Sequence, residues 1–195
     1  NEAEERLGEY KDSDEALRYK LLMLSYINRS RDRYKAQPLA LDILASRVAN
    51  KQSKEAAEKG FSGHWNTAGE KPYHRYAFAG GVDHVAENAA SYWSSVAIDP
   101  ATVLDLMHQC HDRFMAEQAP NDGHKKNVIE KRHTHVGLGF YLTGSNFRYY
   151  EEYIDRYLEF ISYETTVKSG VRTTITVRPL DPAFLVYAAI GFYEP

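Results

Sequence analysis

The chain contains a single cysteine, Cys110, among its 195 residues. One cysteine excludes an intramolecular disulfide and a zinc site built from several thiolates. The chain also lacks a large excess of either charge, because it has 24 Lys and Arg side chains and 27 Asp and Glu side chains, for a net charge of −3. We therefore expect no nucleic-acid partner. No apolar run approaches the ~20 residues that span a bilayer, so we expect no transmembrane segment.

Hydrophobic periodicity predicts a first helix after a polar N-terminus. Residues 1–12 are acidic and polar, and we expect them to form a loose N-terminal arm. Asp12 or Ser13 can cap the free amides of the following helix. Its apolar face at helical spacing is predicted to be Leu17, Leu21, Leu24 and Ile27.

Capping residues mark three further helices. Asp42 is placed to begin the second helix and Gly60 to end it in a left-handed conformation. Asp99-Pro100 combines a capping side chain with proline at the first helical position, which favours a third helix. Asn121 or Asp122 can cap a short fourth helix. The predicted inner stripe of the third helix is Val103, Met107, Cys110 and Phe114.

Between and beyond these helices the pattern changes. Residues 61–98 contain four glycines and are predicted to be a long irregular stretch. From Thr134 the apolar residues alternate, and residues 134–142 and 147–154 are predicted to form an antiparallel hairpin. Residues 156–195 are expected to be a β-rich extension, packed on the core or opening a further unit. Its predicted strands are 171–177 and 184–193, with a break at the prolines of 179–182.

Three polar residues stand at the ends of these elements, and a fourth lies in the stretch between them. His64 follows the second helix, and Glu117 ends the third. His124 begins the fourth helix. Glu87 lies in a segment of small, apolar residues, where a buried carboxylate must be paired or hydrogen-bonded. None of the four indicates a functional site by itself.

Their order along the chain resembles the CAP superfamily, also called the SCP domain, over residues 14–155. Glu117 follows Phe114 with the spacing of the family's W-x-x-E, with phenylalanine in place of tryptophan. An inserted Gly63 and Ala86 in place of glycine are further departures. The similar segments are YINRSR (26–31), PLALD (38–42), FSGH (61–64), AEN (86–88), GHKKNVI (123–129) and THVGLG (134–139).

The resemblance implies an α+β fold, an α–β–α sandwich over residues 13–155 with a small, mostly antiparallel sheet between helices. It also implies a tetrad of two histidines and two acids in a central cleft. By resemblance this tetrad is His64, Glu87, Glu117 and His124.

The chemistry of such a tetrad leaves two uses open. His64 and His124 could ligate a divalent metal such as zinc, with the carboxylates binding it or orienting its water. Alternatively, the four side chains form a hydrogen-bonded network that only fixes the loops. By family resemblance we expect a secreted or extracytoplasmic ligand-binding or interaction module, with a lipid or peptide ligand. The alternatives are a metal-dependent hydrolase with Glu87 or Glu117 as catalytic base, and a structural module.

Other candidate residues carry weaker signals. His108 and His111 lie three apart on the third helix and could chelate a metal. The neighbouring core residues favour one of them being buried against the sheet and the other solvated. His74 and His84 could line the cleft. A serine nucleophile is not indicated, because Ser62 and Ser91 do not lie in a nucleophile-elbow motif.

Overall fold

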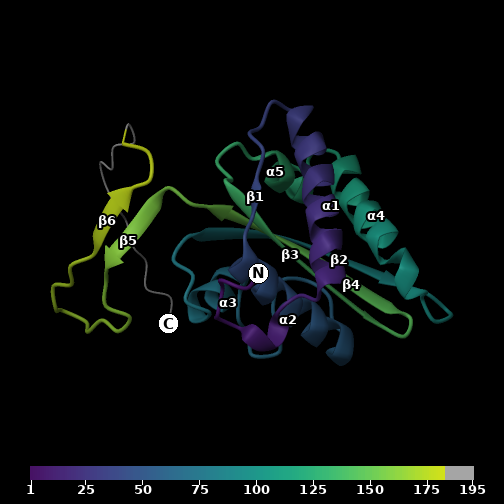
Figure 1. Ribbon diagram of the computed structural model, residues 1–195, viewed down its shortest axis with the longest axis horizontal. Helices are drawn as coiled ribbons and strands as arrows, with labels where there is room; N and C mark the ends of the chain where they lie inside the picture. The colour runs from purple at the N-terminus through teal and green to yellow at the C-terminus, as the bar shows by residue number, and fades with distance from the viewer. Residues whose placement is uncertain (183–195) are drawn as a thin grey trace. The chain divides into compact units, whose positions relative to one another are not determined.

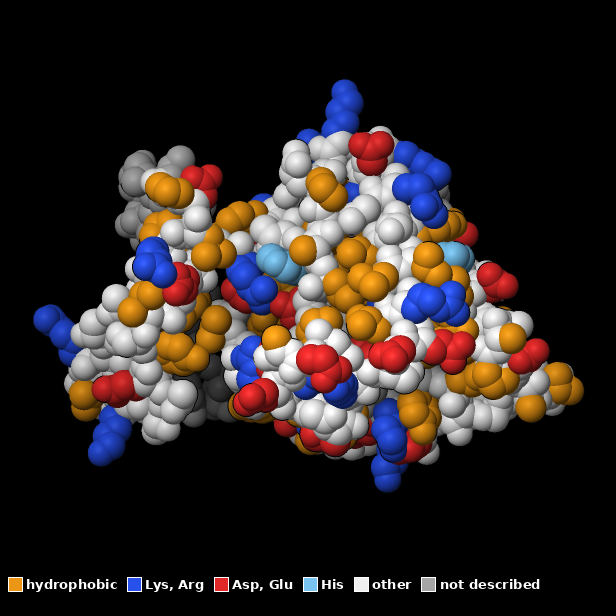
Figure 2. Space-filling model, viewed as in Figure 1, with side chains coloured by type: hydrophobic (Ala, Val, Ile, Leu, Met, Phe, Trp, Pro, Cys, Tyr) orange, Lys and Arg blue, Asp and Glu red, His pale blue; other side chains and the backbone are white. Residues whose placement is uncertain are grey.

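The computed structural model describes residues 1–182. Contacts divide the chain into two units, Asn1–Asp155 and Arg156–Pro195. The strand predicted at 184–193 lies outside the described residues. Within the described part, no helix has both the length and the apolar character to cross a membrane. On the face drawn in Figure 2, basic and acidic side chains are interspersed.

The first unit contains one sheet and helices on both of its faces (Figure 1). The strand order is β1-β3-β4-β2, with β1 parallel to β3 and the other pairs antiparallel. The strands are β1 (Ala40–Leu41), β2 (His84–Trp93), β3 (His135–Thr143) and β4 (Asn146–Asp155). The helices are α1 (Asp14–Asp32), α2 (Ile43–Lys59), α3 (Pro72–Phe78), α4 (Val103–Ala116) and α5 (Gly123–Ile129). Short 3-10 turns, η1 and η2, span Gly8–Tyr10 and Pro100–Thr102.

Each face of the sheet has its own hydrophobic cluster. On one face, α1, α4 and α5 pack on β3 and β4, with Met107, Leu138 and Tyr149 fully buried between them. On the other face, α2 and α3 cover the sheet around Val48 and Tyr76. This arrangement is the predicted α–β–α sandwich. The predicted β3–β4 hairpin is also confirmed.

Two glycines set the distance between α2 and the sheet. A Cβ at Gly137 would lie 2.4 Å from the Ala45 carbonyl carbon, and one at Gly139 would lie 2.2 Å from that of Ala49. Real side chains do not approach so closely, so only glycine permits this contact. Strand β3 therefore alternates as predicted, with its large apolar side chains facing α1 and α4 and its two glycines facing α2.

The predicted caps of α1 and α2 are confirmed, and the predicted inner face of α1 is confirmed only in part, because Ile27 is buried and Leu24 packs against the core but Leu21 does not. Ser13 caps α1, and Asp42 and a left-handed Gly60 bound α2. Leu21 is 49% exposed, whereas Lys20 and Met23 are fully buried. The helix is rotated because its buried face also carries polar residues that bond to the rest of the unit. The buried residues of α1 are Lys20, Met23, Ile27, Ser30 and Arg31.

The N-terminal residues pack on the unit and do not form the loose arm we expected. Arg47 of α2 donates to the backbone oxygens of Asn1 (2.9 Å) and Arg6 (2.6 Å). Lys20 forms a buried ion pair of 2.7 Å with Asp12. These polar contacts hold the N-terminal segment on the unit. The sequence did not predict them, because the segment has few apolar residues and no hydrophobic periodicity.

The stretch 61–98 is more regular than predicted. It contains α3 and the ten-residue strand β2, which pairs with β4 along its whole length. The prediction failed because β2 has polar residues on both of its faces, such as Glu87 and Asn88. Their partners come from distant segments, so the alternation of a half-buried strand is absent.

The second unit contains the antiparallel strands β5 (Leu158–Ser162) and β6 (Thr176–Pro179). The strand predicted at 171–177 begins only at Thr176. Val171 and Ile175 are 61% and 58% exposed, so the alternating apolar side chains before β6 are not buried against another element.

Candidate functional site

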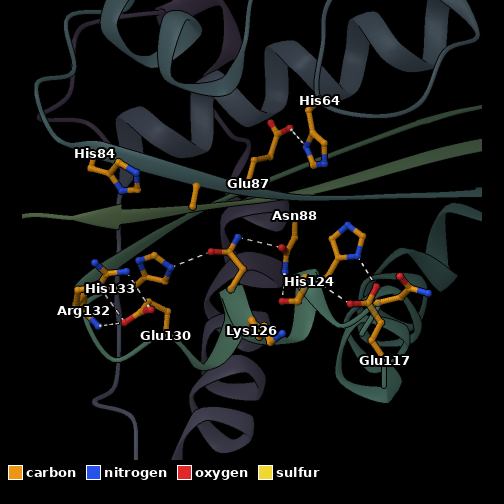
Figure 3. A pocket seen from close by; sticks show the side chains of 14 residues that line it. His64, His84, Glu87, Asn88, Glu117, His124, Lys126, Glu130, Arg132 and His133 are labelled. Atoms are coloured by element: carbon orange, nitrogen blue, oxygen red, sulfur yellow. Dashed lines mark hydrogen bonds and ion pairs between the residues drawn. The ribbon is translucent and has the colours of Figure 1, made fainter. Parts of the chain in front are cut away.

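An open pocket of about 680 Å³ brings the four predicted residues together. His64, Glu87, Glu117 and His124 all line it (Figure 3). They come from the loop after α2, from β2, from the end of α4 and from the start of α5. Four residues that the family resemblance singled out, each from a different element, therefore line the same pocket.

The first half of the tetrad is anchored by a buried arginine. His64 Nδ1 lies 2.7 Å from Glu87 Oε1, and Arg75 of α3 contacts Glu87 Oε2. Arg75 also donates to the His64 carbonyl oxygen at 2.7 Å. The side chain of His64 is 44% exposed, whereas those of Glu87 and Arg75 are 1% and 2% exposed. A buried ion pair thus holds a histidine that faces solvent.

The second half of the tetrad also begins α5. His124 Nδ1 lies 2.5 Å from Glu117 Oε1. Glu117 Oε2 accepts from the backbone N–H of His124 (2.9 Å) and of Lys125 (3.3 Å). Asp122, which we predicted as a possible cap, forms no side-chain cap bond. Glu117 supplies these bonds instead, so it orients both the His124 ring and the helix that carries it.

The two histidine rings lie opposite each other at a centroid separation of 6.4 Å (Figure 3). Both Nδ1 atoms are engaged by carboxylates, which leaves the two Nε2 atoms as the available nitrogens. A ring whose Nδ1–H donates to a carboxylate presents an Nε2 lone pair, which is the arrangement of metal-ligating histidines. In the described part of the chain, no three His, Cys, Asp or Glu side chains form a ready metal cluster. The donor set fits a cation held by two nitrogens and water.

Burial shifts the pKa values around Glu87. Burial raises the pKa of Glu87 to about 7, although Arg75 opposes the shift. The pKa of Glu152, directly opposite Glu87 in the β2–β4 pairing, is raised well above its ordinary value by burial and by the charge of Glu87. Burial also lowers the pKa of His64, with a further contribution from Arg75. Of the two facing carboxyls, Glu87 has the Arg75 guanidinium as the closer partner, which opposes the effect of burial at short range.

The family model named "Cysteine-rich secretory protein family" (CAP) matches residues 24–154, which include every element of this pocket. The chain belongs to the CAP family. A comparison with curated proteins found no significant match.

Two solved structures resemble this CAP domain in fold. An outer surface protein from Borrelia burgdorferi has a TM-score of 0.57 and 16% identity, with 74% of this chain and 96% of that chain covered. An extracellular protein containing an SCP domain from Bacillus anthracis has a TM-score of 0.51 and 20% identity. That match covers 70% of this chain but only 40% of the Bacillus protein.

Two buried acids of β4, Glu151 and Glu152, were not predicted from the sequence, and Glu151 lies on the other face of the CAP sheet from the tetrad's Glu87. Glu151 is fully buried and accepts hydrogen bonds from Tyr149 (3.0 Å) and Tyr153 (2.6 Å). Burial alone would raise its pKa, but His111 and these hydrogen bonds hold the pKa of Glu151 below its ordinary value. Two consecutive acids within an apolar strand were the available signal, because such a pair must face opposite sides of a sheet.

Asn88 connects this carboxylate to the tetrad. Its Nδ2 donates to the His124 carbonyl oxygen (3.1 Å) and to Glu151 Oε2 (3.3 Å). Its Oδ1 accepts from Asn127 of α5 at 3.0 Å. Asn88 is 1% exposed, so it fixes the position of α5 on β2 from inside the fold.

The remaining histidines divide as follows. His111 is fully buried, as predicted for one of the pair, whereas His108 is half-buried and stacks on Tyr26 at 4.2 Å instead of being solvated. His84 lines the pocket, whereas His74 stacks on Phe78 of the same helix. At the far end of the pocket, the Asp155 carboxylate lies close to two histidines, 2.5 Å from His133 Nδ1 and 3.2 Å from His84 Nδ1.

Proposed function

We propose that this CAP domain is a secreted or extracytoplasmic binding module whose His64–His124 pair holds a divalent cation such as zinc. One observation carries the proposal: the two rings lie opposite each other while carboxylates engage both Nδ1 atoms. Neutral imidazole is a good ligand for zinc, and the carboxylates would strengthen it by orienting the rings.

Two nitrogen ligands make an open site. Zinc takes four ligands in most proteins, so water or a ligand group would fill the other positions. When bound, the cation would polarise a carbonyl or carboxylate oxygen that entered the pocket. Glu87, Glu117 and Arg75 would hold the two rings in place throughout.

The pocket provides room for a ligand beyond the cation. Its volume of about 680 Å³ suits a lipid headgroup or a short peptide segment. The extracellular and outer surface proteins with similar folds favour a location outside the cytoplasm. A lipid or peptide ligand of this pocket is part of the proposal.

A metal-dependent hydrolase is the second candidate, and one observation favours it. Glu87 has its pKa raised to about 7, where a general base is most effective. Its 1% exposed side chain, held between His64 and Arg75, favours the binding role instead. A purely structural network remains the third use of the same contacts.

Zinc titration by isothermal calorimetry tests the proposal. We expect the wild type to bind one zinc ion and the His64→Ala, His124→Ala double variant to bind none. His84→Ala is the matched control, because His84 lines the same pocket outside the pair and should leave binding unchanged. A wild type that binds no zinc would contradict both metal-dependent functions and leave the structural network.

A second measurement separates the binding module from the hydrolase. The zinc-loaded wild type is assayed against ester, peptide and phosphoester panels, with and without a chelator. Turnover that the chelator abolishes and that Glu87→Gln lowers would favour the hydrolase. Zinc binding without chelator-sensitive turnover would support the binding module.

A further inference from the structure

A second hydrogen-bonded set of reactive side chains lies on the face of the sheet that α1 and α4 cover. Ser30 Oγ lies 3.1 Å from His111 Nε2, and His111 Nδ1 lies 2.9 Å from Glu151 Oε1. Ser30 is 7% exposed, and the other two are fully buried. These are the contacts by which a serine nucleophile, a histidine base and an orienting carboxylate act together.

The partners of Glu151 set the protonation of this group. The hydroxyls of Tyr149 and Tyr153 and the amide of Asn88 all donate to it, which favours the ionised carboxylate. An ionised carboxylate only accepts hydrogen bonds, so His111 Nδ1 carries a proton. In that tautomer, the Nε2 lone pair of His111 faces the Ser30 hydroxyl at 3.1 Å, as proton abstraction requires.

The orientation of Ser30 is also set by this contact. A serine inside a helix commonly donates to the carbonyl oxygen four residues earlier. Ser25 of the same helix does so, with its Oγ 3.2 Å from the Leu21 oxygen. Ser30 Oγ instead bonds to His111 on α4. The hydroxyl is therefore directed at a base and away from its own backbone.

A separate pocket of about 450 Å³ opens on Ser30. Tyr34 and Met115 line it and offer an apolar surface to an acyl group. Arg29 and Arg33 line it as well. Arginine donors can stabilise the negative charge that develops on a carbonyl oxygen under attack. None of these residues belongs to the tetrad.

We propose that Ser30, His111 and Glu151 form a metal-independent site that hydrolyses short-chain carboxylic esters. Ser30 Oγ bonds to the ester carbonyl carbon while its proton passes to His111 Nε2. The C–O bond to the alcohol then breaks, and the leaving alkoxide takes that proton. Water next attacks the acyl carbon and gives a proton to His111, which returns it to Ser30 as the carboxylic acid leaves. Glu151 is a positioning residue that holds the imidazole.

Covalent labelling of the full chain tests the site directly. A fluorophosphonate probe should phosphonylate Ser30 and release fluoride, as detected by intact mass and peptide mapping. Ser30→Ala should abolish both labelling and hydrolysis of p-nitrophenyl acetate. Ser25→Ala, five residues earlier on the same helix, is the matched control and should retain both. Chelator and the His64→Ala, His124→Ala variant should change neither, because this site does not depend on the proposed zinc.

Glu151→Gln tests the positioning role. We expect the maximal rate of adduct formation to fall about 100-fold while the half-saturating probe concentration stays unchanged. A folded wild type that forms no adduct at Ser30 would overturn the proposal, whether or not Glu151→Gln folds. Ester hydrolysis that survives Ser30→Ala, or that a chelator removes, would also overturn it.

Discussion

Glu87 and Glu152 stand directly opposite each other on β2 and β4, with both side chains 1% exposed. Like charges in this position destabilise a sheet. Arg75 of α3 contacts both carboxyl groups, and burial together with the charge of Glu87 raises the pKa of Glu152 well above its ordinary value. The sheet beside His64 therefore depends on one side chain of a short helix.

Replacing this arginine should be costly. We expect Arg75→Gln to lower the free energy of unfolding by about 3–5 kcal/mol, because it leaves buried carboxyl groups without their cation. Urea denaturation at pH 7 measures the change. Lys54→Gln, which breaks an exposed ion pair with Glu58, is the control and should leave the free energy of unfolding nearly unchanged, because solvent screens that pair. Equal losses for the two variants would show that Arg75 is not the organising cation.

The buried Lys20 should make stability depend on pH. Its pKa is lowered to about 8 by burial, so between pH 8 and 9.5 the unfolded chain binds more protons than the folded one. Stability from this group should rise with pH over that window, by up to about 2 kcal/mol. Lys20→Met should remove the rise, as urea denaturation at several pH values would reveal. A variant with the same slope as the wild type would contradict the shift.

The close contact between β3 and α2 can be tested with one methyl group. Gly139→Ala would place a Cβ 2.2 Å from the Ala49 carbonyl carbon, and we expect a loss of about 1–3 kcal/mol or more in unfolding free energy. Gly123→Ala meets no atom within 4 Å and should change stability by less than about 0.5 kcal/mol. Thermal denaturation followed by circular dichroism compares them. A tolerated Gly139→Ala would mean that α2 can move away from the sheet.

Glu117 should tune the proposed cation site through His124. We expect Glu117→Gln to weaken zinc binding by about 10–100-fold, because it removes the charged partner of Nδ1. Calorimetry gives the affinity, and circular dichroism reports whether α5 persists. Glu130→Gln is the control, since Glu130 lines the same pocket and bonds to Arg132. An unchanged zinc affinity in Glu117→Gln would show that the Glu117 carboxylate does not contribute to cation binding.

Local signals predicted those parts of the fold that depend on local physics. Asp42 and Gly60 bound α2 because capping and the left-handed conformation are properties of single residues. The alternation from Val136 predicted β3 because one face is apolar. The order of His64, Glu87, Glu117 and His124 predicted the pocket residues by resemblance, and no spacing rule would have brought them together.

The features that could not be predicted from the sequence depend on contacts between different segments of the chain. Arg75 could not be predicted as a buried ion-pair residue, because its partner Glu87 is on another element. His111, Ser30 and Glu151 are separated by 40 to 121 positions along the chain, and nothing local links them. Lys20 occupies the buried face of α1 that periodicity assigned to leucine, because Asp12 meets it there.

The lone Cys110 lies fully buried in α4, where burial raises the pKa of its thiol to about 11. A thiol in that state reacts slowly with oxidants and alkylating reagents. The folded native chain should therefore react only slowly with maleimide dyes and thiol-reactive spin labels. A single exposed replacement such as Ser95→Cys would give a uniquely addressable reporter on the folded protein, with Cys110 left in place.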